Sequence, residues 1–165
     1  MDSRYEFRAA SPEDLPVMFE IILRRMRWMD EVGIRQWNVT EYDKVYPLSY
    51  YEEKQRQGQV FVLYDRQKQA IVCAAVLKEE DERWPDRPPA FYLRNFASVL
   101  GESGVGVRFM ALAEDYARAQ GKRFFRLDAS YDNPRLLRYY EDLGYRPVGS
   151  CVDGVYRGTR MEKVL

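Results

Sequence analysis

Residues 100–109 read LGESGVGVRF, with Gly101, Gly104 and Gly106 placed directly before an apolar helical pattern. Glycine lacks the Cβ atom that blocks a close approach to the backbone. The N–H groups at a helix N-terminus are free, and the helix dipole favours an anion there. Read alone, the stretch fits a phosphate-binding turn and an ordinary turn before a helix equally well.

The residues after the glycines disfavour two common nucleotide-binding motifs. The first and last glycines have the spacing of a Walker A loop, but Val107 and Arg108 stand where Lys and Ser/Thr would contact phosphate and metal. The last two glycines begin like a dinucleotide fingerprint, but Phe109 occupies the third glycine position. ATP and NAD are therefore poor candidates for an anion at this turn.

Apolar periodicity predicts strands and helices that alternate along one domain, residues 1–165. Strands are expected over 5–9, 59–64, 70–78, 90–97, 122–128, 145–148 and 155–164, and helices over 12–28, 49–57, 104–120 and 134–143. Residues 79–89 form a charged, proline-rich loop in this interpretation. The order β-α-(α)-β-β-β-α-β-α-β-β predicts a mixed α/β sheet in two or three layers.

The composition excludes several classes of site. The chain contains no histidine, which removes histidine-based triads, histidine zinc sites and an imidazole base, and no metal is expected. Cys73 and Cys151 cannot form a disulfide framework and fit a reducing compartment. The charged N-terminus is no signal peptide, and no apolar run approaches the roughly 18 residues of a membrane span. A cytoplasmic protein without membrane contact is expected.

Nucleic-acid binding is also disfavoured by the distribution of charge. Lys plus Arg and Asp plus Glu both number 26, so the formal net charge is zero. The basic residues of the C-terminal half alternate with acids, which interrupts any continuous basic stripe. They are Arg118, Lys122, Arg123, Arg126, Arg135 and Arg138.

A second motif follows one predicted strand after the glycines: residues 133–145 read NPRLLRYYEDLGY. Together the two stretches resemble the core of the GNAT superfamily of acetyl-CoA-dependent N-acetyltransferases. In that family a Q/R-x-x-G-x-G/A loop opens a long helix, and a helix of pattern N-x-x-(A/L)-x-x-x-Y-(E)-x-x-G-(F/Y) follows the next strand. Residues 90–149 match closely, whereas the N-terminal half agrees mainly in element order. The G-x-G pattern alone is weak, but both blocks at this separation are a strong signal.

The resemblance implies a mixed, mostly antiparallel sheet with helices on both faces and a splayed strand pair that binds acetyl-CoA. The strand 95–99 would pair with the pantetheine arm, one of its N–H groups would polarise the acetyl carbonyl, and the strand 124–128 would splay away from it. The implied cofactor contacts are Phe96, Ala97, Ser98, Gly101, Glu102, Ser103, Gly104, Val105, Gly106 and Asn133. The sequence also predicts Asn133 as the N-cap of the helix that Pro134 begins, and the cap alone is the alternative role of this residue. Gly101 departs from the pattern because it stands at the Gln/Arg position, so a side-chain contact to the pyrophosphate is lost; Arg108 is one candidate substitute.

The resemblance also implies direct attack of an amine on the thioester. Tyr140 occupies the family's tyrosine position and is predicted to protonate the departing thiolate; the alternative is a core aromatic residue. Asp128, at the end of a predicted strand, is the candidate base. Alternatively, Asp128 is a structural carboxylate paired with Arg126 or Arg94.

The acceptor is predicted to be a small or medium-sized amine bound by the segment after the first helix. That segment alternates aromatic rings with carboxylates, which suits a cation. Trp28, Glu31 and Trp37 are the candidate contacts, and a solvated helix with inward-facing aromatic residues is the alternative. A GNAT-like sensor that binds acyl-CoA without catalysis is a second hypothesis, and a homodimer is left open.

Overall fold

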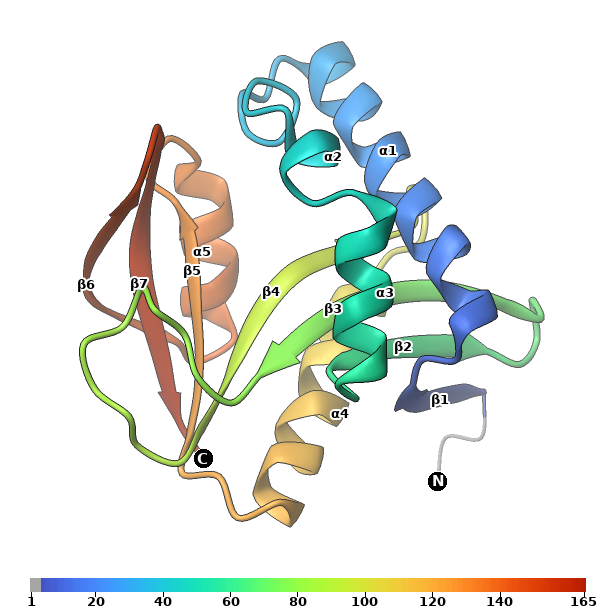
Figure 1. The fold of residues 1–165 in the computed structure, drawn as a ribbon. Coiled ribbons are helices and arrows are strands. Elements are labelled where there is room, and N and C mark those ends of the chain that lie inside the picture. The colour runs from blue at the N-terminus through green and yellow to red at the C-terminus, as the bar shows by residue number, and fades with distance from the viewer. Residues whose placement is uncertain (1–3) are drawn as a thin grey trace.

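The computed structural model describes residues 4–165, in which the strands form one seven-stranded sheet (Figure 1). The first three residues of the charged N-terminal segment lie outside this part of the chain. The strands are β1 Tyr5–Ala9, β2 Val60–Asp65, β3 Ala70–Lys78, β4 Ala90–Ser98, β5 Phe124–Ser130, β6 Arg146–Asp153 and β7 Tyr156–Val164. The helices are the short 3-10 helix η1 Pro12–Asp14, α1 Leu15–Val32, α2 Tyr42–Val45, α3 Leu48–Arg56, α4 Val105–Ala119 and α5 Pro134–Asp142.

The sheet order is β1-β2-β3-β4-β5-β7-β6, and every neighbouring pair is antiparallel except β4 and β5. The predicted mixed, mostly antiparallel sheet is therefore confirmed. β4 and β5 are joined by the crossover helix α4, as parallel neighbours must be. Figure 1 shows the two strands side by side at one end and apart at the other.

Two apolar cores cover the two faces of the sheet, because side chains alternate along each strand. Phe61 and Leu63 of β2 join the core beneath α4 and α5, whereas Val60 and Val62 join the core beneath α1 and α3. The helices consequently lie on both faces, as predicted.

Several predicted boundaries differ from the structure. Helix α1 continues beyond Trp28 to Val32 and ends at Gly33, which adopts a left-handed φ of 78°. The short helix α2 was not predicted, and β6 extends to Asp153 where the sequence suggested an end at Val148. Most side chains in the added parts are exposed or half-buried, Met29 and Cys151 excepted, so these parts carry little apolar periodicity.

An extra residue kinks β4 in its second half. Between the pairs Ala74–Ala97 and Val76–Arg94, β3 advances by two residues and β4 by three. Asn95 lies in this bulge with φ 56°, a left-handed conformation that asparagine adopts more readily than most residues. The bulge begins where β4 has lost its pairing with β5.

The described helices include none that is both long enough and apolar enough to cross a membrane.

Candidate functional site

The opening between β4 and β5 is the feature around which the candidate residues gather. The two strands pair only from Ala90–Phe124 to Tyr92–Arg126, although β4 continues to Ser98. The second half of β4 therefore has an unpaired edge facing the gap. This is the splay that the resemblance implied, and it leaves backbone N–H and C=O groups available to a ligand.

The glycine-rich turn connects this edge to α4. Gly101 and Gly104 have φ values of 80° and 83°, which side chains with a Cβ rarely adopt. Gly104 is the N-cap of α4, and no side chain among the described residues caps the helix. The first N–H groups of α4 are thus left for a partner outside the helix. The acidic side chain at Glu102 instead forms an ion pair with Lys68, from the β2–β3 turn.

The predicted cofactor contacts on β4 point in different directions. The Phe96 ring faces α4, where its centroid lies 5.3 Å from that of Phe109. Ala97 belongs to the core under α1 and α3. The Ser98 carbonyl and hydroxyl both accept hydrogen bonds from Arg25 of α1, at 2.7 and 2.9 Å.

Asn133 serves as the N-cap of α5 and also contacts the loop after α1. Its Oδ1 accepts a hydrogen bond from the Leu136 N–H at 3.1 Å, so the predicted cap is confirmed. Its Nδ2 donates to Gln36 Oε1 at 3.1 Å. The residue thereby links the α1–α2 segment to the start of α5.

Tyr140 lies in the core between α5 and the sheet, and its ring packs edge-on against Tyr139 and Tyr145. Burial raises the pKa of its phenol well above the ordinary value, with Tyr139, Cys73 and Asp128 adding to the effect. Its hydroxyl forms no hydrogen bond with any of the residues 4–165. Protein atoms do not enclose this hydroxyl completely. The raised pKa therefore keeps the phenol protonated near neutral pH.

Tyr139 is a residue that the sequence interpretation did not assign to the site. A Cβ added to Gly106 would lie 3.0 Å from the Tyr139 hydroxyl, so this hydroxyl rests against the first turn of α4. Burial raises its pKa as well. The two adjacent tyrosines consequently lie in different places, Tyr139 beside the glycine-rich turn and Tyr140 deeper in the core.

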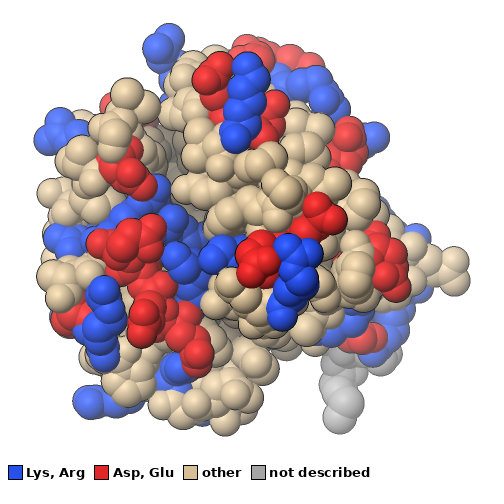
Figure 2. Space-filling view, in the orientation of Figure 1, with Lys and Arg blue, Asp and Glu red and all other residues tan. Residues whose placement is uncertain are grey.

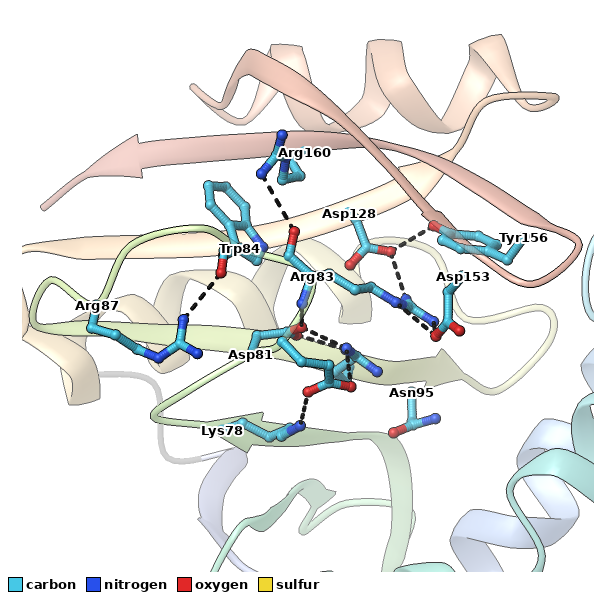
Figure 3. A network of polar contacts seen from close by, with 12 residues as sticks. Lys78, Asp81, Arg83, Trp84, Arg87, Asn95, Asp128, Asp153, Tyr156 and Arg160 are labelled. Atoms are coloured by element: carbon cyan, nitrogen blue, oxygen red, sulfur yellow. Dashed lines mark hydrogen bonds and ion pairs between the residues drawn. The ribbon is translucent and has the colours of Figure 1, made fainter.

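Asp128 lies on the opposite face of β5 from Tyr140, and its Oδ1 accepts two hydrogen bonds (Figure 3). Arg83 Nη1 donates at 3.0 Å and the Tyr156 hydroxyl at 2.6 Å. The alternative pairing with Arg126 or Arg94 is not seen, because both guanidiniums are held by other carboxylates. Asp128 is nevertheless paired with an arginine, as that alternative implied. Within the described residues, Oδ2 of Asp128 accepts no hydrogen bond.

Residues 79–89, the strap, run across the sheet and bring Arg83 to Asp128. Asp81 is buried and binds Arg94 of β4 through two contacts of 2.7 and 2.6 Å. Asp81 Oδ1 also accepts the backbone N–H of Arg83 at 2.9 Å. Figure 3 shows the Arg83 guanidinium between Asp128 and Asp153, to which it also bonds.

Charge on this side of the molecule is sorted around the opening. In Figure 2, Lys and Arg gather in the middle of the visible face, with Asp and Glu around them.

A cavity of about 400 Å³ lies under the strap and is lined by Gln59, Lys78, Glu79, Glu80, Asp81, Glu82 and Arg87. None of the predicted catalytic or cofactor residues lines it, so it is separate from the opening between β4 and β5. In residues 4–165 no cluster of three His, Cys, Asp or Glu could bind a metal.

A series of contacting aromatic rings runs from the segment after α1 into α3, with centroids 4.4, 4.9, 4.8 and 5.1 Å apart in turn. The first pair is stacked, and the later pairs are tilted or edge-on. The rings are those of Trp37, Tyr42, Tyr46, Tyr50 and Tyr51, here named the aromatic ladder. Asn95, in the bulge of β4, donates to the Tyr42 hydroxyl at 2.6 Å and accepts from the Tyr50 hydroxyl at 3.0 Å. The ladder is thus attached to the splayed strand.

The three predicted acceptor contacts are not brought together. Trp37 belongs to the aromatic ladder, whereas Trp28 lies under the Arg25 guanidinium, 5.0 Å from its ring centroid. Glu31 is exposed near the end of α1.

The sequence interpretation missed two residues near the opening, Asn95 and Arg83. Asn95 was missed because neither the bulge nor the left-handed conformation has a signature in apolar periodicity, and Arg83 was missed because it lies in a loop.

Solved structures of other proteins share this fold, whereas sequence comparisons find no match. No protein-family model matches the chain, and none of the curated proteins matches it. A GNAT-family acetyltransferase from Listeria monocytogenes has a similar structure, with a TM-score of 0.79 and 20% identity over 98% of this chain and 95% of that one. The chain has the GNAT fold.

Two further structures with the GNAT fold hold ligands. The PaiA N-acetyltransferase from Thermoplasma acidophilum, in complex with coenzyme A, matches with a TM-score of 0.73 and 18% identity over 100% of both chains. YncA, a putative acetyltransferase from Salmonella typhimurium with acetyl-CoA, matches with a TM-score of 0.69 and 19% identity over 99% of this chain and 95% of that one.

Proposed function

We propose that the protein is an N-acetyltransferase that transfers the acetyl group of acetyl-CoA to a primary amine. The opening between β4 and β5, next to the uncapped N-terminus of α4, is the observation that carries the proposal. It combines an unpaired strand edge for an amide-rich chain with a helix terminus for a phosphate. Similar structures from T. acidophilum and S. typhimurium hold coenzyme A and acetyl-CoA, which supports this choice of ligand.

The proposed cofactor path begins at the glycine-rich turn. The amides of residues 103–106 bind the pyrophosphate, and the open edge of β4 bonds to the pantetheine arm. Gly101, Glu102 and Asn133 flank this path, and Phe96 closes it towards α4. Because Asn133 already caps α5, its contact with the pantetheine arm would be made through the Nδ2 group that now donates to Gln36.

The proposed chemistry places an acid and a base on opposite faces of β5. Tyr140 lies on the face covered by α5, and Asp128 lies on the face covered by the strap. An amine entering from the side of Asp128 attacks the thioester carbon, so that a C–N bond forms and the C–S bond breaks. Asp128 Oδ2 accepts the proton that the amine loses, and the Tyr140 hydroxyl protonates the thiolate. Exchange with solvent restores both groups.

The acceptor is proposed to be a small or medium-sized cationic amine that approaches the aromatic ladder. Ring faces attract ammonium groups within about 6 Å of the centroid. Some acids of this segment have local partners, since Glu41 pairs with Lys44, Glu53 with Arg56, and Asp30 accepts from Asn38. The aromatic faces, rather than these acids, are therefore the better-supported contact.

Binding and turnover test the proposal separately. Titration calorimetry with coenzyme A is expected to give saturable binding, and thiol release from acetyl-CoA is expected to rise with at least one amine of a cationic panel. Binding without turnover on any amine would favour the sensor hypothesis. Absence of coenzyme A binding would overturn both hypotheses.

A glycine substitution tests the proposed pyrophosphate contact. Gly104→Ala forces a Cβ into a left-handed conformation beside the α4 amides, and about 1–2 kcal/mol of stability should be lost. Gly121→Ala is the matched control, because Gly121 has a φ of 78°, a similar open environment and a place at the far end of α4. Both variants should unfold more easily in urea, but only Gly104→Ala should bind coenzyme A more weakly. Equal loss of affinity in both would contradict the contact.

A further inference from the structure

Arg25 forms no ion pair with a carboxylate among the described residues, in contrast to three other buried or half-buried arginines near the sheet. Arg83, Arg94 and Arg126 each form an ion pair with Asp or Glu. Arg25 is half-buried, and among residues 4–165 its guanidinium meets only carbonyl and hydroxyl oxygens. A partly desolvated cation without a counter-charge is costly in a folded protein. An anion from outside the chain would offset that cost.

The pKa values of these arginines reflect the same difference. Burial disfavours the charged form of each guanidinium. Neighbouring carboxylates outweigh burial and raise the pKa of Arg83, Arg94 and Arg126. At Arg25 burial is the largest effect, and the pKa is lowered.

The Arg25 guanidinium lies at the open edge of β4. The Val99 N–H bonds to Val72 of β3, and neighbouring residues of an antiparallel strand point to opposite edges. The Ser98 carbonyl consequently points into the gap left by β5, where Arg25 Nε binds it at 2.7 Å. Arg25 Nη2 reaches Ser98 Oγ and the Val99 carbonyl at 2.9 and 3.3 Å. The cation therefore lies where the strand enters the glycine-rich turn.

Two other cations near this turn are already engaged. Lys68 forms an ion pair with Glu102. Arg108 extends over the Tyr5 ring of β1, 5.5 Å from its centroid. Arg108, which the sequence suggested as a substitute for the missing side chain at Gly101, is therefore not the favoured residue.

We propose that Arg25 binds the pyrophosphate of the cofactor and supplies the side-chain contact that Gly101 lacks. This inference rests on the proposed function. Two nitrogens hold the guanidinium against Ser98 and Val99, and the Trp28 ring lies beside it. The third nitrogen, Nη1, has no acceptor among the described residues. A planar guanidinium fixed in this way is suited to a phosphate oxygen, since little side-chain freedom is lost on binding.

The test compares a ligand that has the pyrophosphate with one that lacks it. Arg25→Met keeps most of the apolar stem of the side chain but removes the charged guanidinium and its hydrogen bonds. Its dissociation constant for coenzyme A is expected to rise about 10- to 100-fold, or about 1.4–2.8 kcal/mol. Turnover of S-acetylpantetheine, which lacks the pyrophosphate, should stay at the wild-type level. Affinity for coenzyme A should also depend less on salt in the variant.

Controls separate this role from a purely structural one. Arg27→Met removes a cation two residues away on the same helix and should change affinity for coenzyme A little, because Arg27 is exposed and pairs with Glu20. Equal losses with coenzyme A and S-acetylpantetheine in Arg25→Met would assign Arg25 to fold support and overturn the inference. Unchanged coenzyme A affinity in Arg25→Met would also overturn it while leaving the proposed function intact. If the wild-type protein bound no coenzyme A, the proposed function itself would fail.

Discussion

Replacing Tyr140 by Phe is expected to lower kcat for acetyl transfer about 100- to 10,000-fold while the dissociation constant for coenzyme A stays unchanged. The substitution removes one hydroxyl and keeps the ring that packs against Tyr139 and Tyr145. That hydroxyl makes no hydrogen bond with the described residues, so little stability depends on it. The loss should therefore appear in the chemical step.

The protonation state of Tyr140 gives this prediction a pH dependence. An ordinary phenol has a pKa of about 10. Burial, aided by the neighbouring Tyr139, raises the pKa of Tyr140 above that value, so the phenol keeps its proton throughout the neutral and mildly alkaline range. Wild-type kcat should consequently show no loss from Tyr140 ionisation up to about pH 10. A decrease in kcat with an apparent pKa near 8 that disappears in Tyr140→Phe would contradict the raised pKa, although it would still identify Tyr140 as the acid.

Tyr139→Phe is the matched control, because it removes the same group one residue earlier on α5. Its hydroxyl lies beside Gly106 at the start of α4. We expect this variant to affect coenzyme A binding more than kcat, measured by calorimetry and by thiol release at saturating amine. If Tyr139→Phe abolished turnover and Tyr140→Phe did not, the acid would be Tyr139.

The parts of the fold that the sequence predicts are those with strong local signals. The glycine-rich turn, the Asn133 cap and the apolar stripes of α1 and α4 appear where expected, because capping and periodicity depend on near neighbours in the chain. The splay between β4 and β5 came only from the resemblance. The two strands separate after Tyr92, and this point depends on pairing between residues more than 30 positions apart. Apolar periodicity along the chain gives no information about such pairing.

The candidate site divides in the same way. Tyr140 and the glycines belong to local motifs, whereas Arg83, Asn95 and Arg25 depend on contacts across the fold. Arg83 reaches Asp128 from a loop 45 residues away in sequence, and Arg25 reaches Ser98 across 73. The alternative partners that the sequence suggested for Asp128, Arg126 and Arg94, were wrong for the same reason. The sequence shows which arginines are present but not the path of the strap.

The ion pair between Asp81 and Arg94 is expected to be the most stability-sensitive polar contact of the strap. Side-chain exposure is 1% for Asp81 and 8% for Arg94, and two hydrogen bonds join them. Asp81→Ala leaves the guanidinium buried without its main counter-charge, since Glu82 lies farther away at 3.4 Å. The free energy of unfolding in urea should fall by about 3–5 kcal/mol. The surface pair Arg118–Asp115 is the control, and Asp115→Ala should cost less than about 1 kcal/mol.

Removing both partners distinguishes the buried charge from the lost contact. In Asp81→Leu with Arg94→Met no charge is left unpaired, so most of the stability lost in Asp81→Ala should return. Attachment of the strap should not return, because Asp81 also accepts the Arg83 N–H, and Arg83 is the residue that bonds to Asp128. The double variant should therefore be stable but impaired in amine turnover, with coenzyme A affinity unchanged. Full turnover in this variant would show that the strap holds the fold and that Asp128 needs no positioning by Arg83.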